Sequence, residues 1–141
     1  MKTKFSTKWK RSEKAAKQRS YRCRAPLHIR HKFMSANLSK ELREKYGRRS
    51  LPIRKGDIVR IMKGEFKKKK GKIISIDTKK GKVFVEGIQR LKKDGTKTNV
   101  PLSPHVLQIT ELLLEDKKRV KVLQRKNLQE KKEKISEEKK S

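Results

Sequence analysis

From Gly56 onward, apolar and polar residues alternate with a period of two, which is the pattern of half-buried strands. The alternation predicts strands at 57–62, 72–77, 82–88 and 106–110. Two shorter pieces, 89–92 and 97–100, flank Asp94-Gly95, a dipeptide that favours a tight hairpin turn. Short strands joined by glycine-containing turns predict a small barrel. Its expected core consists of Val59, Ile61, Ile74, Ile76, Val83, Val85, Val106 and Ile109.

The segment before the barrel has a helical pattern instead. A partial apolar stripe predicts a short helix within 25–38, and this stripe consists of Leu27, Phe33, Met34 and Leu38. Ser39 is a suitable N-cap for a second helix. We expect that helix to end at Gly47, because glycine favours the left-handed position after a helix. An extended linker, 51–53, then leads into the barrel.

Both ends of the chain are highly charged. Residues 1–24 contain ten basic residues and one acidic residue, with aromatic side chains interleaved. Residues 12–19 could form only two helical turns, which are marginal in water. We therefore expect an arm that orders on a polyanion rather than a solvated tail. In 111–141 a thin apolar stripe predicts a charged helix, and this stripe consists of Leu113, Val120, Leu123 and Leu128.

The excess of basic residues indicates a polyanionic binding partner. The 141 residues include 44 Lys and Arg against 15 Asp and Glu, a formal net charge of +29. Such a chain repels itself unless a polyanion neutralises it, and nucleic acid is a stronger candidate than an anionic membrane surface. One cysteine, no apolar run of about 20 residues and no secretory signal predict a cytosolic or nuclear protein without membrane insertion. Organelle targeting is the alternative.

The sequence contains little that indicates a catalytic site or a metal site. Four side chains could in principle bind zinc, but their spacing matches no structural zinc pattern: Cys23, His28, His31 and His105. The acidic residues of the barrel are scattered over strand ends and turns, so we expect Asp57 and Glu86 to act in salt bridges or turns. No phosphate-binding loop, serine-hydrolase or zinc-protease motif occurs. The sequence predicts no enzyme, no cofactor and no metal.

The run KGDIVRIMKGEFKKKKGKIISIDTKKGKVFVEGI, residues 55–88, resembles the KOW motif. In that motif two strands and a basic loop form half of an SH3-like barrel. Gly64 and Gly71 permit positive φ and let a phosphate backbone come close.

The flanks make the resemblance more specific. The run APLHIRHKFMSANLSKELREKYGRRSLPIRKGD, together with VEGIQRLKKDGT, resembles the universal twenty-four family of large-subunit ribosomal proteins, the eukaryotic twenty-six proteins. The resemblance covers roughly residues 20–123. The upstream run is the more diagnostic part, because KOW modules also occur in transcription elongation factors. Many members of this ribosomal family carry a glycine inside the basic loop, roughly where Lys68 stands, and lysine adopts positive φ only at a cost.

The resemblance implies a structural constituent of the large ribosomal subunit that binds rRNA near the exit of the nascent-chain tunnel and supports assembly. The implied partners are large-subunit rRNA, neighbouring ribosomal proteins and factors that meet the nascent chain, and no homo-oligomer is expected. The hairpin at 93–97 matches the family's exposed hairpin. The implied location is the cytoplasmic ribosome, with nuclear or nucleolar passage in a eukaryote.

The hydrophobic patterns and the family resemblance together predict a mainly β fold. It consists of a small SH3-like barrel with a basic helical N-terminal extension and a charged C-terminal helix. The expected parts are 1–50, 51–112 and 113–141. A free RNA chaperone or transcription-associated KOW factor, a nuclease and a nonspecific polyanion binder remain as alternatives. The nonspecific binder would show a steep salt dependence without sequence preference.

The predicted RNA contacts fall into three groups. In the arm, cationic side chains would thread between rRNA helices and two aromatic rings would stack on unpaired bases: Lys4, Lys8, Trp9, Lys10, Arg11, Lys14, Lys17, Arg19, Tyr21, Arg22 and Arg24. In the helical region and linker, side chains would contact phosphates or bases: His28, Arg30, His31, Lys32, Arg48, Arg49 and Arg54. At the barrel rim, lysines would clamp a second rRNA segment: Lys67, Lys68, Lys69, Lys70 and Lys72.

Overall fold

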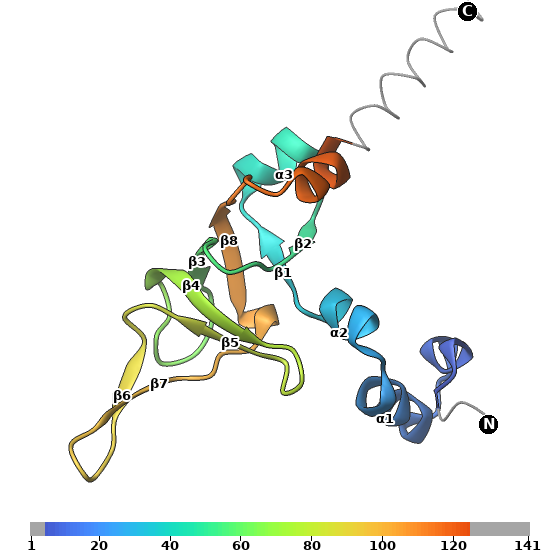
Figure 1. Ribbon diagram of the computed structural model, residues 1–141, viewed down its shortest axis with the longest axis horizontal. Coiled ribbons are helices and arrows are strands. Elements are labelled where there is room, and N and C mark those ends of the chain that lie inside the picture. Colours follow the sequence, from blue (N-terminus) through green and yellow to red (C-terminus); the bar gives the residue numbers. More distant parts are fainter. Residues whose placement is uncertain (1–4, 125–141) are drawn as a thin grey trace, which may run out of the picture.

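The computed structural model describes residues 5–124, and its centre is a curled six-stranded sheet (Figure 1). The strand order is β2-β1-β8-β3-β4-β5. The predicted strands occur as β3 (Ile58–Ile61), β4 (Lys70–Asp77), β5 (Lys82–Val85) and β8 (Leu107–Glu111). β3, β4 and β5 form an antiparallel meander, and β8 pairs antiparallel with β3. The result is a small barrel-like domain.

The Asp94-Gly95 prediction is confirmed by a separate two-stranded hairpin of β6 (Gln89–Leu91) and β7 (Lys97–Asn99). Gly95 adopts φ 82°, which the tight turn requires and which glycine reaches without steric cost. This hairpin projects away from the six-stranded sheet (Figure 1).

Helices and two unexpected strands occupy the first third of the chain. The helical segments are η1 (Thr7–Arg11), α1 (Ala15–Arg24), α2 (Leu27–Phe33) and α3 (Lys40–Tyr46), followed later by η2 (Pro104–Val106) and a helix at 117–124. The strands are β1 (Ser35–Leu38) and β2 (Ser50–Pro52). The fold is therefore mixed α and β, and the expectation of a mainly β chain was wrong in this respect.

The prediction of a helical stripe that continues to Leu38 was wrong. The chain leaves α2 after Phe33, and Met34, Ala36 and Leu38 become buried at alternate positions of an extended segment. β1 pairs antiparallel with β2 and parallel with β8, where Leu38 lies opposite Ile109. These three side chains follow a period of two because alternate residues of an extended segment face the same side of a sheet. The boundaries at residues 50 and 112 stay a prediction.

Helix α3 has the ends that the sequence predicted. The Ser39 hydroxyl accepts a hydrogen bond from the Leu42 backbone N–H at 3.4 Å, and Glu41 lies in the electropositive first turn. Gly47 follows the helix in the left-handed conformation, with φ 59°. The Arg43 Nε also donates to the Leu38 carbonyl at 2.9 Å, which holds α3 against the end of β1.

Most of the predicted barrel core is confirmed, with one change of register. Val59, Ile61, Val83, Val85 and Ile109 are all buried, whereas Ile76 and Val106 are half-buried. On β4, however, Ile73 is 1% exposed and Ile74 is 40% exposed. The pairing of β4 with β5 shifts between Ile73 and Ser75, so one residue is inserted and the inward face changes.

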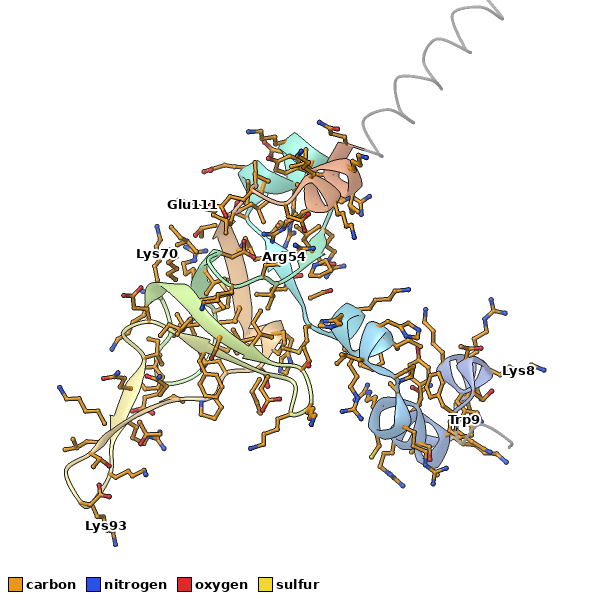
Figure 2. The ribbon with its side chains drawn as sticks, viewed as in Figure 1. Lys8, Trp9, Arg54, Lys70, Lys93 and Glu111 are labelled. Carbon is orange, nitrogen blue, oxygen red and sulfur yellow. The ribbon has the colours of Figure 1, made fainter. Side chains whose placement is uncertain are left out.

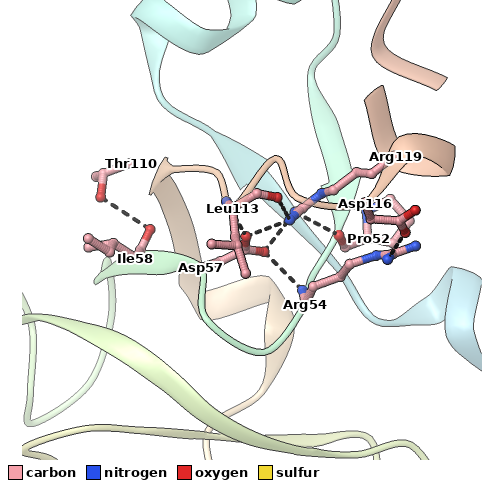
Figure 3. A network of polar contacts seen from close by, with 8 residues as sticks. All are labelled: Pro52, Arg54, Asp57, Ile58, Thr110, Leu113, Asp116 and Arg119. Carbon is pink, nitrogen blue, oxygen red and sulfur yellow. Dashed lines mark hydrogen bonds and ion pairs between the residues drawn. The ribbon is translucent and has the colours of Figure 1, made fainter. Parts of the chain in front are cut away.

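A buried ion pair attaches the C-terminal helix to the barrel (Figure 3). The Arg119 guanidinium donates from Nη1 and Nη2 to the two Asp57 carboxylate oxygens, at 2.6 and 2.7 Å. The same carboxylate accepts the backbone N–H groups of Arg54 and Leu113, at 2.9 and 3.1 Å. The exposed side-chain fractions are 3% for Arg119 and 0% for Asp57. The prediction that Asp57 serves a salt bridge or turn is confirmed on both counts.

The predicted C-terminal stripe is only partly present. Leu123 is 2% exposed and joins the core, and Val120 is half-buried. Leu113 precedes the helix and is 37% exposed. Leu128 lies outside the described residues.

Candidate nucleic-acid interface

The basic arm is folded around its own small apolar cluster. Tyr21, Ala25 and Ile29 are buried together, and Phe5 and Trp9 pack against them. The Gln18 side-chain amide donates to three backbone carbonyls between residues 9 and 12, at 2.7 to 3.3 Å, which closes η1 onto α1. These contacts give residues 5–24 a defined shape, and the ordering of the arm on a polyanion stays a prediction.

The cationic side chains of η1 and α1 are exposed around that cluster. All those predicted to bind RNA within residues 5–24 are exposed: Lys8, Lys10, Arg11, Lys14, Lys17, Arg19, Arg22 and Arg24. Lys4 lies outside the described residues. Exposed cations on a fixed framework can contact several phosphates at once with little loss of conformational entropy on binding.

The two aromatic residues predicted to stack on bases differ from each other. Tyr21 is 9% exposed, with Phe5 stacked on it at 5.3 Å between ring centroids and Phe33 at 5.6 Å. Tyr21 therefore packs within the arm cluster, and its stacking on a base stays a prediction. Trp9 is half-buried, with Lys17 Nζ 5.3 Å from its ring centroid, and its stacking on a base stays a prediction.

Helix α2 carries a second basic group. His28, His31 and Lys32 are exposed. Arg30 is half-buried and ties two parts of the molecule together: its Nε and Nη2 donate to carbonyls at the end of α1, at 2.8 and 2.6 Å, and its Nη1 reaches the Lys79 carbonyl at 3.4 Å. Arg30 thus fixes the arm relative to the β4–β5 turn, a role that the sequence alone did not reveal.

The linker arginines lie near the C-terminal helix. Arg54 pairs with Asp116, and both side chains remain partly exposed, at 49% and 29% (Figure 3). Arg49 is exposed and Arg48 is half-buried. Because Asp116 already neutralises Arg54 in part, Arg48 and Arg49 offer more uncompensated charge to a phosphate than Arg54 does.

The rim lysines lie in the β3–β4 loop and at the start of β4. Lys67, Lys68, Lys69, Lys70 and Lys72 are all exposed. Hydrogen bonds between Ile61 and the backbones of Lys68 and Lys69, at 2.8 and 2.9 Å, close the loop. Lys68 has φ 72° and is the one non-glycine residue with positive φ among residues 5–124. The lysine therefore adopts the left-handed conformation that glycine reaches without steric cost.

The two glycines of this loop have different uses. Gly64 has φ 94° and open space around it, as predicted. Gly71 does not have positive φ, so that part of the prediction was wrong. A Cβ on Gly71 would lie 2.6 Å from the Glu86 carbonyl oxygen, so this glycine lets two segments of the protein's own backbone come close.

The β6–β7 hairpin adds further positive charge. Arg90 pairs with Glu65 of the rim loop at 2.6 Å, and both side chains are about two-thirds exposed, at 67% and 64%. At the tip, the Thr96 hydroxyl donates to Asp94 at 2.7 Å and lowers the pKa of that carboxyl, and the Thr96 backbone N–H lowers it further. The tip carboxylate therefore stays ionised and caps the turn through Thr96.

These groups do not form one patch. Lys8 and Trp9 lie at the far end of the arm, Lys70 lies on the opposite side of the sheet, and Lys93 marks the hairpin tip (Figure 2). A molecule with this distribution can touch separate nucleic-acid segments simultaneously. Sequence reasoning missed Lys79 and Lys80, which lie beside Arg30; the signal was the Lys-Lys-Gly turn, which we interpreted only as a turn.

Other chemistry finds no support in residues 5–124. No three or more histidine, cysteine, aspartate or glutamate side chains of that part of the chain converge in a way that could hold a metal ion. Nor does any helix within it have the length and apolar character needed to cross a membrane.

Comparison with known proteins decides the family. A family model that describes the eukaryotic L26 and the archaeal L24 ribosomal proteins matches residues 12–126. The chain belongs to this family. The L26/L24 family is structural and non-enzymatic, which agrees with the absence of catalytic motifs from the sequence. The match includes the upstream run and residues 55–88, so the resemblance to this ribosomal family is confirmed.

Two archaeal relatives extend the comparison. The "Large ribosomal subunit protein uL24" of Korarchaeum cryptofilum (strain OPF8) is 48% identical over 118 residues, which cover 84% of this chain and 90% of the relative. The protein of the same name from Methanosphaera stadtmanae is 44% identical over 115 residues, which cover 82% of this chain and 98% of the relative. The similarity therefore extends over nearly the whole of both relatives.

Proposed function

We propose that this chain is a structural constituent of the large ribosomal subunit, where it binds rRNA and contacts neighbouring ribosomal proteins. The observation that carries the proposal is membership of the L26/L24 family over residues 12–126. The net charge of +29 gives the physical reason, because contact with phosphates releases counterions and relieves the self-repulsion of the chain. Its place of action is the cytoplasmic ribosome, with nuclear or nucleolar passage if the cell is eukaryotic.

The proposed mechanism is bridging by a shaped, basic body. The arm contributes exposed cations on η1 and α1, and the barrel contributes the rim lysines at the other side of the sheet (Figure 2). Duplex RNA hides its base edges, so recognition depends on phosphates and 2′-hydroxyls arranged in space. A protein with two separated basic groups can hold two rRNA segments at a fixed distance and so support assembly.

We further propose that the barrel is of the SH3-like KOW type, and that it presents the β6–β7 hairpin near the exit of the nascent-chain tunnel. The meander of β3, β4 and β5 with a basic first loop supports the fold assignment. The exposed hairpin, with Leu91 65% exposed, supports a role at a surface where factors and nascent chains pass. In this proposal residues 1–50 form the basic N-terminal extension, 51–112 the barrel and 113–141 the charged C-terminal helix.

The first test is a sucrose-gradient profile of a lysate, washed at high salt and then dissociated with EDTA. We expect the protein to remain near stoichiometric with the large-subunit peak. A protein that washes to the top of the gradient would refute the ribosomal role and favour a looser interaction with polyanions.

The second test addresses the rim lysines. Replacing Lys67, Lys68, Lys69 and Lys70 with glutamine should weaken rRNA crosslinking and reduce the slope of log K against log salt by roughly 0.7–0.9 for each phosphate that the loop no longer neutralises. The matched control changes four exposed lysines elsewhere: Lys40, Lys45, Lys117 and Lys118. Unchanged crosslinking and subunit incorporation in the rim variant, or an equal loss in the control, would refute the rim contact.

A further inference from the structure

A cleft with a volume of about 570 Å³ lies between the helical arm and the β4–β5 turn. Its cationic lining comes from both sides: Arg22 from α1 and Arg30 from α2, Lys79 and Lys80 from the β4–β5 turn, and His105 from η2. None of the described residues that line it is acidic. Its volume lies within the range of about 300–1,000 Å³ that is usual for sites that hold a small organic group.

The walls of this cleft are held in place. Arg30 bonds to the Cys23 and Ala25 carbonyls on one side and reaches the Lys79 carbonyl at 3.4 Å on the other, so it links the two walls. On the opposite side, Asp77 Oδ1 accepts the backbone N–H groups of Lys79 and Lys80 at 2.9 and 3.0 Å. These bonds fix the turn while the two lysine side chains remain exposed.

The lining also includes an aromatic ring. Phe33, the last residue of α2, is 42% exposed although its ring packs against Tyr21 at a centroid distance of 5.6 Å and an interplanar angle of 61°. Apolar side chains of Met34 and Pro104 complete this part of the lining. A site for phosphate alone would not need an exposed ring, whereas bases that have left a helix commonly stack on aromatic side chains.

We infer that this cleft receives a single unstacked nucleotide of the rRNA, with its base against Phe33 and its phosphate among Arg22, Lys79 and Lys80. The inference rests on the proposed function and adds a site for one flipped-out base to contacts that otherwise depend on phosphates. Because the cleft joins the arm to the barrel, an occupant would also hold these two parts together.

The test uses large subunits reconstituted around the full-length chain, with base-specific chemical probing of the rRNA. In wild-type subunits one unpaired nucleotide should be protected. With Phe33→Ala its reactivity should rise about fivefold or more, since stacking on an aromatic side chain corresponds to roughly five- to a hundredfold in the population of the stacked base. Phe33→Tyr should restore the protection. Met62→Leu, at a side chain 40% exposed outside the cleft, is the control and should change nothing.

Phe33→Ala could also disturb the arm, so a second variant covers that case. Fluorescence of Trp9, the one tryptophan of the chain, reports the arm cluster. The double change Lys79→Gln with Lys80→Gln leaves that cluster intact and should expose the same nucleotide. Normal incorporation with no responding nucleotide in either variant would overturn the cleft assignment alone. Absence of the wild-type chain from washed subunits would overturn the proposed function and this inference with it.

Discussion

The ion pair between Asp57 and Arg119 makes a sharp prediction about stability. Arg119→Met keeps a long apolar side chain but removes the guanidinium, which leaves the Asp57 carboxylate buried with only two backbone N–H donors. Asp57→Asn keeps the shape and leaves the Arg119 cation buried without its counter-charge. Breaking a buried pair by removing one partner costs about 3–5 kcal/mol. Each single variant should therefore lose that much of a total of roughly 5–15 kcal/mol.

The double variant isolates the interaction free energy between Asp57 and Arg119 from the contacts that each makes with other groups. Asp57→Asn together with Arg119→Met removes both charges. The single amide oxygen of this variant can accept the backbone N–H of either Arg54 or Leu113, which bond to different carboxylate oxygens of Asp57. Its cost should be far below the sum of the single costs, because neither charge is then left buried alone. We expect a coupling free energy of about 3 kcal/mol or more, toward the upper end of the range for residues in contact.

Urea unfolding followed by far-ultraviolet circular dichroism measures these costs, and it does not depend on Trp9 in the arm. The matched control is Arg54→Met, which breaks the neighbouring pair with Asp116. Those side chains are 49% and 29% exposed, so the loss should be at most about 1 kcal/mol. Single costs below about 1 kcal/mol at Asp57 or Arg119, or single costs that simply add, would refute the reasoning.

Three further predictions concern the loops. Lys68→Gly should raise the free energy of unfolding, measured in urea, by about 0.5–1 kcal/mol. Glycine relieves the strain of the positive φ, and this gain exceeds the entropy that glycine adds to the unfolded chain. A lower free energy of unfolding would contradict this. Gly71→Ala should destabilise it by about 1–3 kcal/mol, because the new Cβ would meet the Glu86 carbonyl oxygen, and an unchanged midpoint would count against that contact. Thr96→Val should raise the pKa of Asp94 towards its usual value in an NMR titration. Since the folded pKa is lowered, the turn's contribution is present above the unfolded pKa and is lost as pH falls through the folded one; an unshifted titration in the variant would contradict the assignment.

Strand positions, the α3 caps and the hairpin turn could be predicted because each depends on local preferences. Ser39 and Gly47 act within one helix, and Asp94-Gly95 acts within one turn. Ile74 was predicted to be buried because strict alternation continues through β4, but the irregular pairing with β5 buries Ile73 instead. A bulge is decided by the partner strand, so the alternation along β4 alone does not reveal it.

Long-range partners could not be predicted in the same way. Asp57 was expected to serve a salt bridge, but its partner Arg119 lies 62 residues away and is one of many cations in the chain. The same applies to the cleft, where Arg30 and the β4–β5 turn are 49 residues apart. Pairings of this kind depend on how the sheet and the arm pack, and a sequence with 44 lysines and arginines offers too many equivalent choices.

The central position of β8 has a consequence for the order of folding. β1 and β3 both pair with β8, and Ile109 lies opposite Leu38 on one side and Val59 on the other. The arm cluster and the β3–β4–β5 meander rely on nearby residues, which find each other quickly. The sheet as a whole must wait until residues 107–111 are synthesised and inserted between two earlier strands. A growing chain would thus present a formed basic arm to rRNA before its barrel had closed.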